Sequence, residues 1–119
     1  MSPLDERLGS GAAQDQRAAV RQRVLLAGRL VYGDASLTID CAIRDLSDTG
    51  ARVRLSGPVA LPSRLYLIEV RTGMAFDAEV AWRRVPEFGL RFSEAHDLKT
   101  SANPKMKLLK RIWLDSVAR

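Results

Sequence analysis

The sequence contains one cysteine and one histidine, and aromatic residues make up only 6% of its 119 positions. Cys41 has no second cysteine with which to form an intramolecular disulfide bond, so a disulfide scaffold is excluded. With His96 as the single histidine, the chain also lacks the clustered sulfur and nitrogen ligands of a structural zinc site. His96 has no nucleophile or metal ligand beside it, so we expect no catalytic role for it.

Long apolar runs are also missing. No stretch approaches the roughly 18–20 apolar residues that a membrane-spanning helix needs. Residues 1–16 are small, polar and acidic, whereas a secretory signal is apolar. We therefore expect a cytoplasmic protein without a membrane span, in which residues 1–16 form a flexible leader before about one domain.

The charge of the chain is positive but unevenly distributed. Nineteen Lys and Arg against fourteen Asp and Glu give a formal net charge of +5, which favours an anionic partner such as nucleic acid. Residues 24–92, however, hold nine basic and eight acidic side chains, whereas residues 93–119 hold six and three. The near-neutral middle argues against a uniformly basic binding face, so we expect no nucleic-acid partner.

Residues 24–92 consist of short β-rich runs separated by turn residues at spacings of roughly 8–12 residues. Apolar and polar residues alternate along these runs, which predicts that Cys41 and Trp82 lie in the core. The run over residues 65–70 is apolar on both faces, as is typical of a central or barrel strand. The pattern predicts a mainly β domain, a small antiparallel barrel or sandwich, with six strands over residues 24–32, 37–44, 51–55, 65–70, 74–83 and 88–92.

The end of the chain has helical rather than strand periodicity. Asn103 supplies a side-chain N-cap, and Pro104 is suited to the first helical turn. A helix over residues 104–117 is predicted by apolar residues at helical spacing, namely Met106, Leu109, Ile112, Trp113 and Val117. We expect this stripe to pack on the mouth or flank of the β-domain; the alternative is a partner or dimer surface.

Two short motifs carry the functional signal. Arg17 and Arg21 stand four residues apart just before the first strand, and the connection between the second and third strands holds Asp45, Ser47 and Gly50. A carboxylate accepts hydrogen bonds from the N1–H and N2–H₂ edge of guanine, while arginines bind phosphate and stack on bases. Glycine permits a positive φ and close approach of a ligand to the backbone. Together the motifs favour a site for an anionic guanine nucleotide, although each alone also fits a solvated helix face or a self-capping turn.

The two motifs, R-x-x-x-R followed 24 positions later by D-x-S-x-x-G, resemble those of the PilZ domain, the bacterial receptor module for cyclic di-GMP. The resemblance covers about residues 16–95. It includes a late pair of strands in which Ala81–Arg84 and Gly89–Phe92 look like the closing hairpin of that family. It implies a six-stranded PilZ-type β-barrel with a C-terminal helix and a flexible N-terminal arm.

The resemblance assigns roles to the arm at residues 17–23, which opens a domain spanning residues 17–119. Arg17 and Arg21 match the arginines that grip the guanine bases and phosphates. Gln16 stands where many family members have a further arginine, and Gln16 and Arg23 are additional candidate contacts.

The resemblance also assigns the second motif. Asp45 and Ser47 match residues that hydrogen-bond a guanine, and Gly50 matches the glycine that keeps the turn open. These five motif residues imply a non-enzymatic second-messenger receptor with cyclic di-GMP as its ligand and no cofactor. We expect it to relay its signal to a protein partner in motility, exopolysaccharide synthesis or a related process. The alternatives are a PilZ-like adaptor that binds only protein and a basic nucleic-acid-binding barrel.

Overall fold

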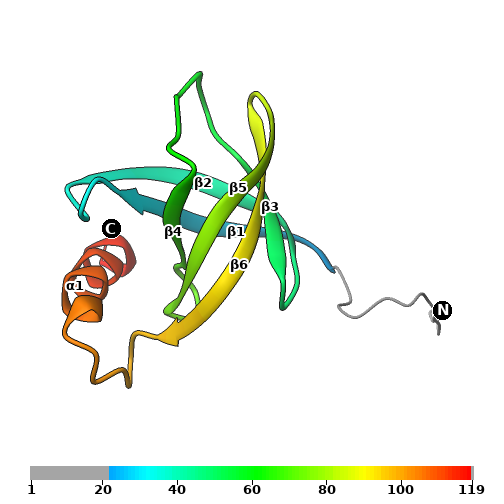
Figure 1. Cartoon of the computed structure of the whole chain (residues 1–119). Helices are drawn as coiled ribbons and strands as arrows, with labels where there is room; N and C mark the ends of the chain where they lie inside the picture. The colour runs from blue at the N-terminus through cyan, green and yellow to red at the C-terminus, as the bar shows by residue number, and fades with distance from the viewer. Residues whose placement is uncertain (1–21, 119) are drawn as a thin grey trace, which may run out of the picture.

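In the computed structural model of the chain, residues 22–118 are described and form six β-strands and one helix. All neighbouring strands pair antiparallel and close into a barrel in the order β1-β2-β3-β6-β5-β4 (Figure 1). This confirms the predicted six-stranded antiparallel barrel with its C-terminal helix. The elements are β1 (Gln22–Tyr32), β2 (Leu37–Leu46), β3 (Gly50–Arg54), β4 (Arg64–Glu69), β5 (Met74–Arg84), β6 (Glu87–Asp97) and α1 (Lys105–Val117).

Three strands are longer by two residues or more than the sequence pattern predicts: β1, which begins at Gln22, β2 and β6. The strand β2 continues through Leu46, so the connection to β3 has only residues 47–49 and Asp45 belongs to the strand. The strand β6 continues to Asp97, well past residue 92. The extra length arises because polar residues continue the backbone ladder: Met74 of β5 pairs with Asp97, and Arg52 of β3 pairs with Asp45.

The barrel interior is filled by alternate side chains of all six strands. Cys41 lies there as a small buried residue, as predicted, and burial together with the charge of Asp40 raises the pKa of its thiol to about 12. The other fully enclosed side chains of this cluster include Leu30, Ile43, Val53, Leu67 and Phe88. Each such side chain removed from water stabilises the fold by about 1.5–3 kcal/mol.

The helix α1 packs on the outside of the barrel and forms a second apolar cluster there. Met106 and Leu109 are buried against Val31 of β1 and Ile68 of β4. This explains why residues 65–70 are apolar on both faces: one face fills the barrel and the other supports the helix. Within the described part of the chain, no helix is long and apolar enough to cross a membrane.

The two ends of α1 can be compared with the predicted N-cap and the predicted apolar stripe of the helix. Asn103 Oδ1 accepts a hydrogen bond of 3.0 Å from the Lys105 N–H, but the N-cap position is Pro104, which has no side-chain cap hydrogen bond, so Asn103 lies one residue before its predicted position. At the other end Val117 is 54% exposed. Its predicted place in the buried stripe is wrong, because the apolar contacts of the barrel reach only as far as Trp113.

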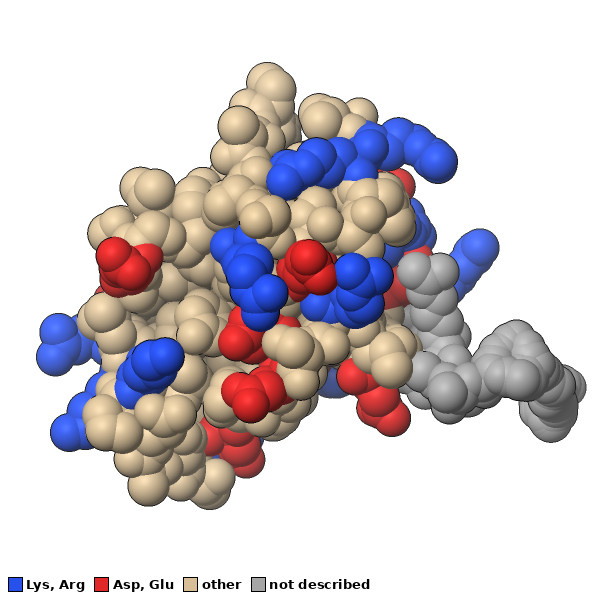
Figure 2. All heavy atoms as spheres, in the orientation of Figure 1, with Lys and Arg blue, Asp and Glu red and all other residues tan. Residues whose placement is uncertain are grey.

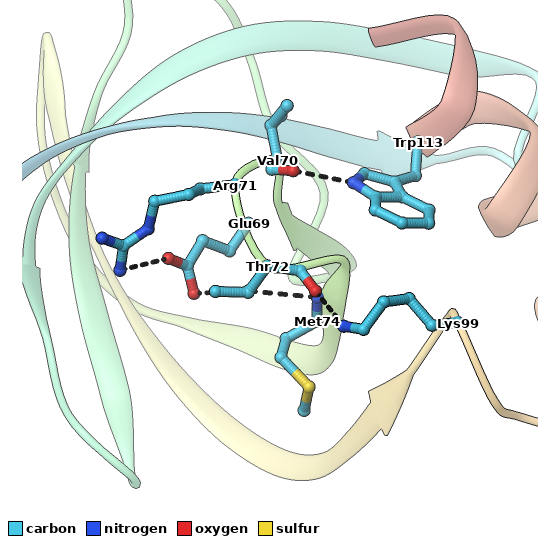
Figure 3. A network of polar contacts seen from close by, with 7 residues as sticks. All are labelled: Glu69, Val70, Arg71, Thr72, Met74, Lys99 and Trp113. Carbon is cyan, nitrogen blue, oxygen red and sulfur yellow. Dashed lines mark hydrogen bonds and ion pairs between the residues drawn. The ribbon is translucent and has the colours of Figure 1, made fainter. Parts of the chain in front are cut away.

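Trp113 fastens α1 to the turn between β4 and β5 (Figure 3). Its indole N–H donates a hydrogen bond of 2.7 Å to the carbonyl of Val70. The ring covers Gly73, where an added Cβ would lie 2.7 Å from the indole and where φ is +77°. The Lys99 ammonium lies over the indole, 6.0 Å from a ring centroid, and donates to the carbonyl of Thr72. The helix is therefore held by directed contacts as well as by apolar packing.

Candidate functional site

A β-bulge turns Asp45 to the outer face of the barrel. Ile43 pairs with Val53 and Asp45 pairs with Arg52, which leaves Arg44 as an extra residue in β2. Strict alternation would have placed Asp45 inside the barrel with Cys41 and Ile43. The bulge instead sets its carboxylate beside outward-facing side chains of β3 and β6.

The carboxylate of Asp45 is buried but has a partner. Its side chain is 9% exposed, and its Oδ2 accepts a hydrogen bond from Nε of Arg52. The same guanidinium donates from Nη1 to Glu87 Oε2 at 2.7 Å. The hydrogen bond to Asp45, followed by that to Glu87, raises the pKa of Arg52 above its usual range. One arginine thus holds two carboxylates from β2 and β6.

Ser47 shapes the short connection that follows. Its N–H donates to the Gly50 carbonyl at 2.9 Å, and its Oγ accepts from the Thr49 N–H at 3.2 Å. The hydroxyl also lies 3.3 Å from the Gly50 carbonyl. The connection is therefore a self-capping turn, and its hydrogen bonds hold the Ser47 side chain in place.

Gly50 is needed here for a reason other than the expected one. Among the described residues, positive φ at glycine occurs at Gly33 and Gly73, so the expectation of a positive φ at Gly50 is wrong. A Cβ on Gly50 would lie 2.3 Å from the Leu90 carbonyl oxygen. The glycine therefore allows β3 to lie against β6 at the point where the turn ends.

Trp82 lies on the outer face of the barrel, and its predicted place in the core is wrong. Val80 pairs with Leu90 and Trp82 pairs with Gly89, which makes Ala81 an extra residue in β5 and reverses the alternation. The indole is 37% exposed and rests directly on Gly89, where a Cβ would lie 2.0 Å from the indole nitrogen. The Arg84 guanidinium stands 5.7 Å from a ring centroid of Trp82.

Two hollows on this outer face share Trp82 as a wall. One, of about 330 Å³, is lined by the turn that holds Ser47 and Gly50 together with residues of β5 and β6. The other, of about 470 Å³, is lined by Arg23, Asp45, Arg52, Trp82, Arg84 and Glu87. Carboxylate, hydroxyl, aromatic face and exposed cations therefore line one continuous region at the end of the barrel where β1 begins.

The structure brings together the part of the predicted site that it describes. Asp45, Ser47 and Gly50 lie at this end, and Arg23 pairs in register with Asp45. Gln16, Arg17 and Arg21 lie outside the described residues. Arg52 and Glu87 belong to neither sequence motif, and the alternation of β5 predicts Trp82 in the core.

The surface charge has no single sign. On the face shown in Figure 2, basic and acidic side chains are interspersed. Arg91 and Glu79, for example, form an exposed ion pair at 2.9 Å across β5 and β6. This agrees with the near-neutral charge of residues 24–92.

Comparison with solved structures finds several similar chains. The PilZ domain of CeSA from a cellulose-synthesizing bacterium matches with a TM-score of 0.54 at 19% identity, over 82% of this chain and 97% of that one. The Bacillus subtilis inhibitor of motility MotI/DgrA matches with a TM-score of 0.54 at 17% identity, over 87% of this chain and 51% of that one. YcgR from Escherichia coli, solved with c-di-GMP, gives a TM-score of 0.45 at 21% identity, over 87% of this chain and 48% of that one.

The comparison with curated proteins gave no match. The family model described as the PilZ domain matches residues 15–103, which is most of the chain and includes both sequence motifs. The six-stranded barrel and this match agree with one another, and the chain belongs to the PilZ domain family.

Proposed function

We propose that the chain is a non-enzymatic receptor for cyclic di-GMP and that the ligand binds on the outer face around Asp45, Ser47 and Trp82. The observation that carries the proposal is the placement of a buried carboxylate, a fixed hydroxyl and an exposed indole around two adjoining hollows. Cyclic di-GMP offers guanine edges to the Asp45 carboxylate and the Ser47 hydroxyl, and a flat base to the Trp82 indole. Its phosphates can pair with the arginines nearby.

Asp45 is the residue proposed to select guanine. Arg52 takes Oδ2, and among the described residues no hydrogen bond to Oδ1 is present. A carboxylate in this position accepts from guanine N1–H and N2–H₂, and adenine has no matching pair of donors. Because Arg52, which also donates to Glu87, holds Asp45 in place, the acceptor is oriented before the ligand arrives.

The proposed phosphate contacts come from the start of β1 and the end of β5. Arg23 and Arg84 line the larger hollow, and neither forms an ion pair with a carboxylate of residues 22–118. Arg21 is bonded directly to Gln22, which pairs with Leu46 beside Asp45. We infer that Arg17 and Arg21 complete the site from this end, and that their ordering on the ligand creates the surface that relays the signal to a protein partner.

Isothermal titration of the full chain with cyclic di-GMP tests the proposal. We expect micromolar or tighter binding that falls at least about tenfold in Asp45→Asn, since the variant loses a charged acceptor. Asp48→Asn is the matched control, because it makes the same change on an exposed residue of the same turn and leaves binding unchanged.

Two further titrations separate the alternatives. Cyclic di-AMP, which lacks the guanine edge, is expected to bind at least about tenfold more weakly. A nucleic-acid-binding barrel would instead bind oligonucleotides with an affinity that falls steeply with salt and would not distinguish the two cyclic dinucleotides. No heat with cyclic di-GMP at micromolar concentration would overturn the proposal and favour a protein-only adaptor.

A further inference from the structure

The outward face of α1 carries an apolar pair preceded along the helix by three cations. Leu114 is 49% exposed and Val117 is 54% exposed, and the two stand three residues apart on the same helix face. Lys107, Lys110 and Arg111 precede Leu114 by seven, four and three residues, so all three share its face. We call these five residues the basic helix face.

The cations of this face have no acidic partner in the described part of the chain. Lys107, Lys110 and Arg111 form no ion pair with any carboxylate of residues 22–118. On the barrel, by contrast, Arg52 and Arg91 are each within 3 Å of a carboxylate oxygen. The helix has only one acidic residue, Asp115, so its positive charge is left available to another molecule.

The basic helix face is held rigidly. The opposite side of α1 is buried through Met106 and Leu109 and fastened by the hydrogen bond from Trp113 to Val70 (Figure 3). Side chains on such a support need no ordering of the backbone on binding, which lowers the entropic cost of association. Figure 1 places α1 on the side of the barrel away from the connection between β2 and β3.

We infer that the basic helix face is a docking surface for an acidic protein segment that presents apolar side chains. The exposed apolar pair offers surface that a partner can bury, and the cations next to it offer complementary charge to an acidic partner. Complementary charge sets the rate and the specificity of such an encounter. The surface belongs to the unliganded chain, and the inference does not depend on the binding of cyclic di-GMP.

A second copy of the chain is a poor occupant of this surface. A two-fold symmetric contact between two helices would bring Lys107, Lys110 and Arg111 close to the same residues of the other copy. Like charges facing one another oppose association. A partner that carries carboxylates removes this repulsion and neutralises the cations.

The test uses the full ¹⁵N-labelled chain without nucleotide and a synthetic amphipathic peptide of Glu and Leu at helical spacing. We expect amide chemical-shift changes centred on residues 107–118, and binding that weakens as salt is raised. A peptide in which Ser replaces Leu keeps the charge and is expected to bind about tenfold more weakly. Anionic phosphatidylglycerol vesicles form a separate arm and are expected to bind more weakly than the Glu–Leu peptide.

Variants then locate the contact. Lys110→Glu and Leu114→Ser are expected to weaken peptide binding about tenfold each. Lys105→Glu is the matched control, because it makes the same charge change on the same helix but lies at the groove beside Tyr66 and Asp77, away from the basic helix face. It is expected to bind within about twofold of the unmodified chain. Thermal unfolding confirms that each variant is folded.

Several results would overturn the inference. They are the absence of peptide binding, equal binding of the Ser-containing peptide, shift changes confined to the end that holds Arg23, or an equal loss in Lys105→Glu. Binding to the vesicles without binding to the peptide would assign the surface to a membrane instead. None of these results changes what the titration with cyclic di-GMP shows, so the two proposals are judged separately.

Discussion

Arg52 on β3 donates a hydrogen bond to the carboxylate of Asp45 on β2, and the two residues are direct partners in the strand register. The pair lies on the outer face of the barrel, where Glu87 of β6 accepts from the same guanidinium. The residue that the motif assigns to guanine recognition is therefore oriented by an arginine that the motif does not contain.

Replacing Arg52 by alanine is expected to lower both stability and ligand affinity. The change leaves the Asp45 carboxylate, which is 9% exposed, without its charged donor, so the free energy of unfolding should fall by more than it does in Arg91→Ala. Urea denaturation measures this. Arg91→Ala breaks an exposed pair with Glu79 and should cost less than about 1 kcal/mol. Equal stability of both variants would mean that Arg52 does not support Asp45.

Gly50→Ala is expected to destabilise the barrel through a backbone collision. The added methyl group meets the Leu90 carbonyl oxygen at 2.3 Å, and since neither backbone can yield freely, we expect a loss of about 1–3 kcal/mol. Gly57→Ala is the matched substitution, because nothing lies within 4 Å of its added Cβ. Thermal or urea unfolding measures the loss of stability in each variant. A stable Gly50→Ala protein would contradict the close approach of β3 and β6.

Trp82 is expected to report ligand binding by its fluorescence. The sequence has two tryptophans, so the Trp113→Phe variant leaves Trp82 as the single reporter. Addition of cyclic di-GMP should change its emission. Trp82→Ala should weaken binding about tenfold, because stacking of a base on an aromatic ring contributes about 1–3 kcal/mol. Trp113→Phe alone should bind as the unmodified chain does. Undiminished affinity in Trp82→Ala would remove the indole from the site.

Cys41 is expected to resist thiol reagents while the protein is folded. Only the thiolate reacts, and with its pKa raised to about 12 by burial and by Asp40, the thiolate fraction at pH 8 falls about a thousandfold. Labelling with a chromogenic disulfide should be slow at pH 8, faster as the pH rises toward 12, and fast in concentrated urea. Rapid labelling of the native protein at pH 8 would show that the thiol is accessible.

The fold was predictable because most strands carry a clear alternation and four of the five connections between strands contain Gly or Pro. Residues 65–70, apolar on both faces, correctly indicated a strand covered on both sides. The helix was predictable in the same way, from Asn103 and from the spacing of Met106 and Leu109.

The outward placement of Asp45 and Trp82 could not be predicted from the sequence, because it depends on a β-bulge in each of their strands. Arg44 and Ala81 each shift the register by one, and neither has a side chain that marks a bulge in a sequence. Without the extra residue Ala81, strict alternation along β5 would place Trp82 in the core. The partnership of Arg52 with Glu87 joins residues 35 positions apart and emerges only when β3 and β6 pair.

The strand β1 connects the two surfaces of this molecule. Arg23 near its start pairs with Asp45, and Val31 near its end lies beneath α1. At about 3.3 Å for each residue, these two positions are roughly 25 Å apart along one hydrogen-bonded strand. The strand thus acts as a spacer of fixed length between the two proposed surfaces, and a nucleotide bound at one would not compete for room with a protein bound at the other.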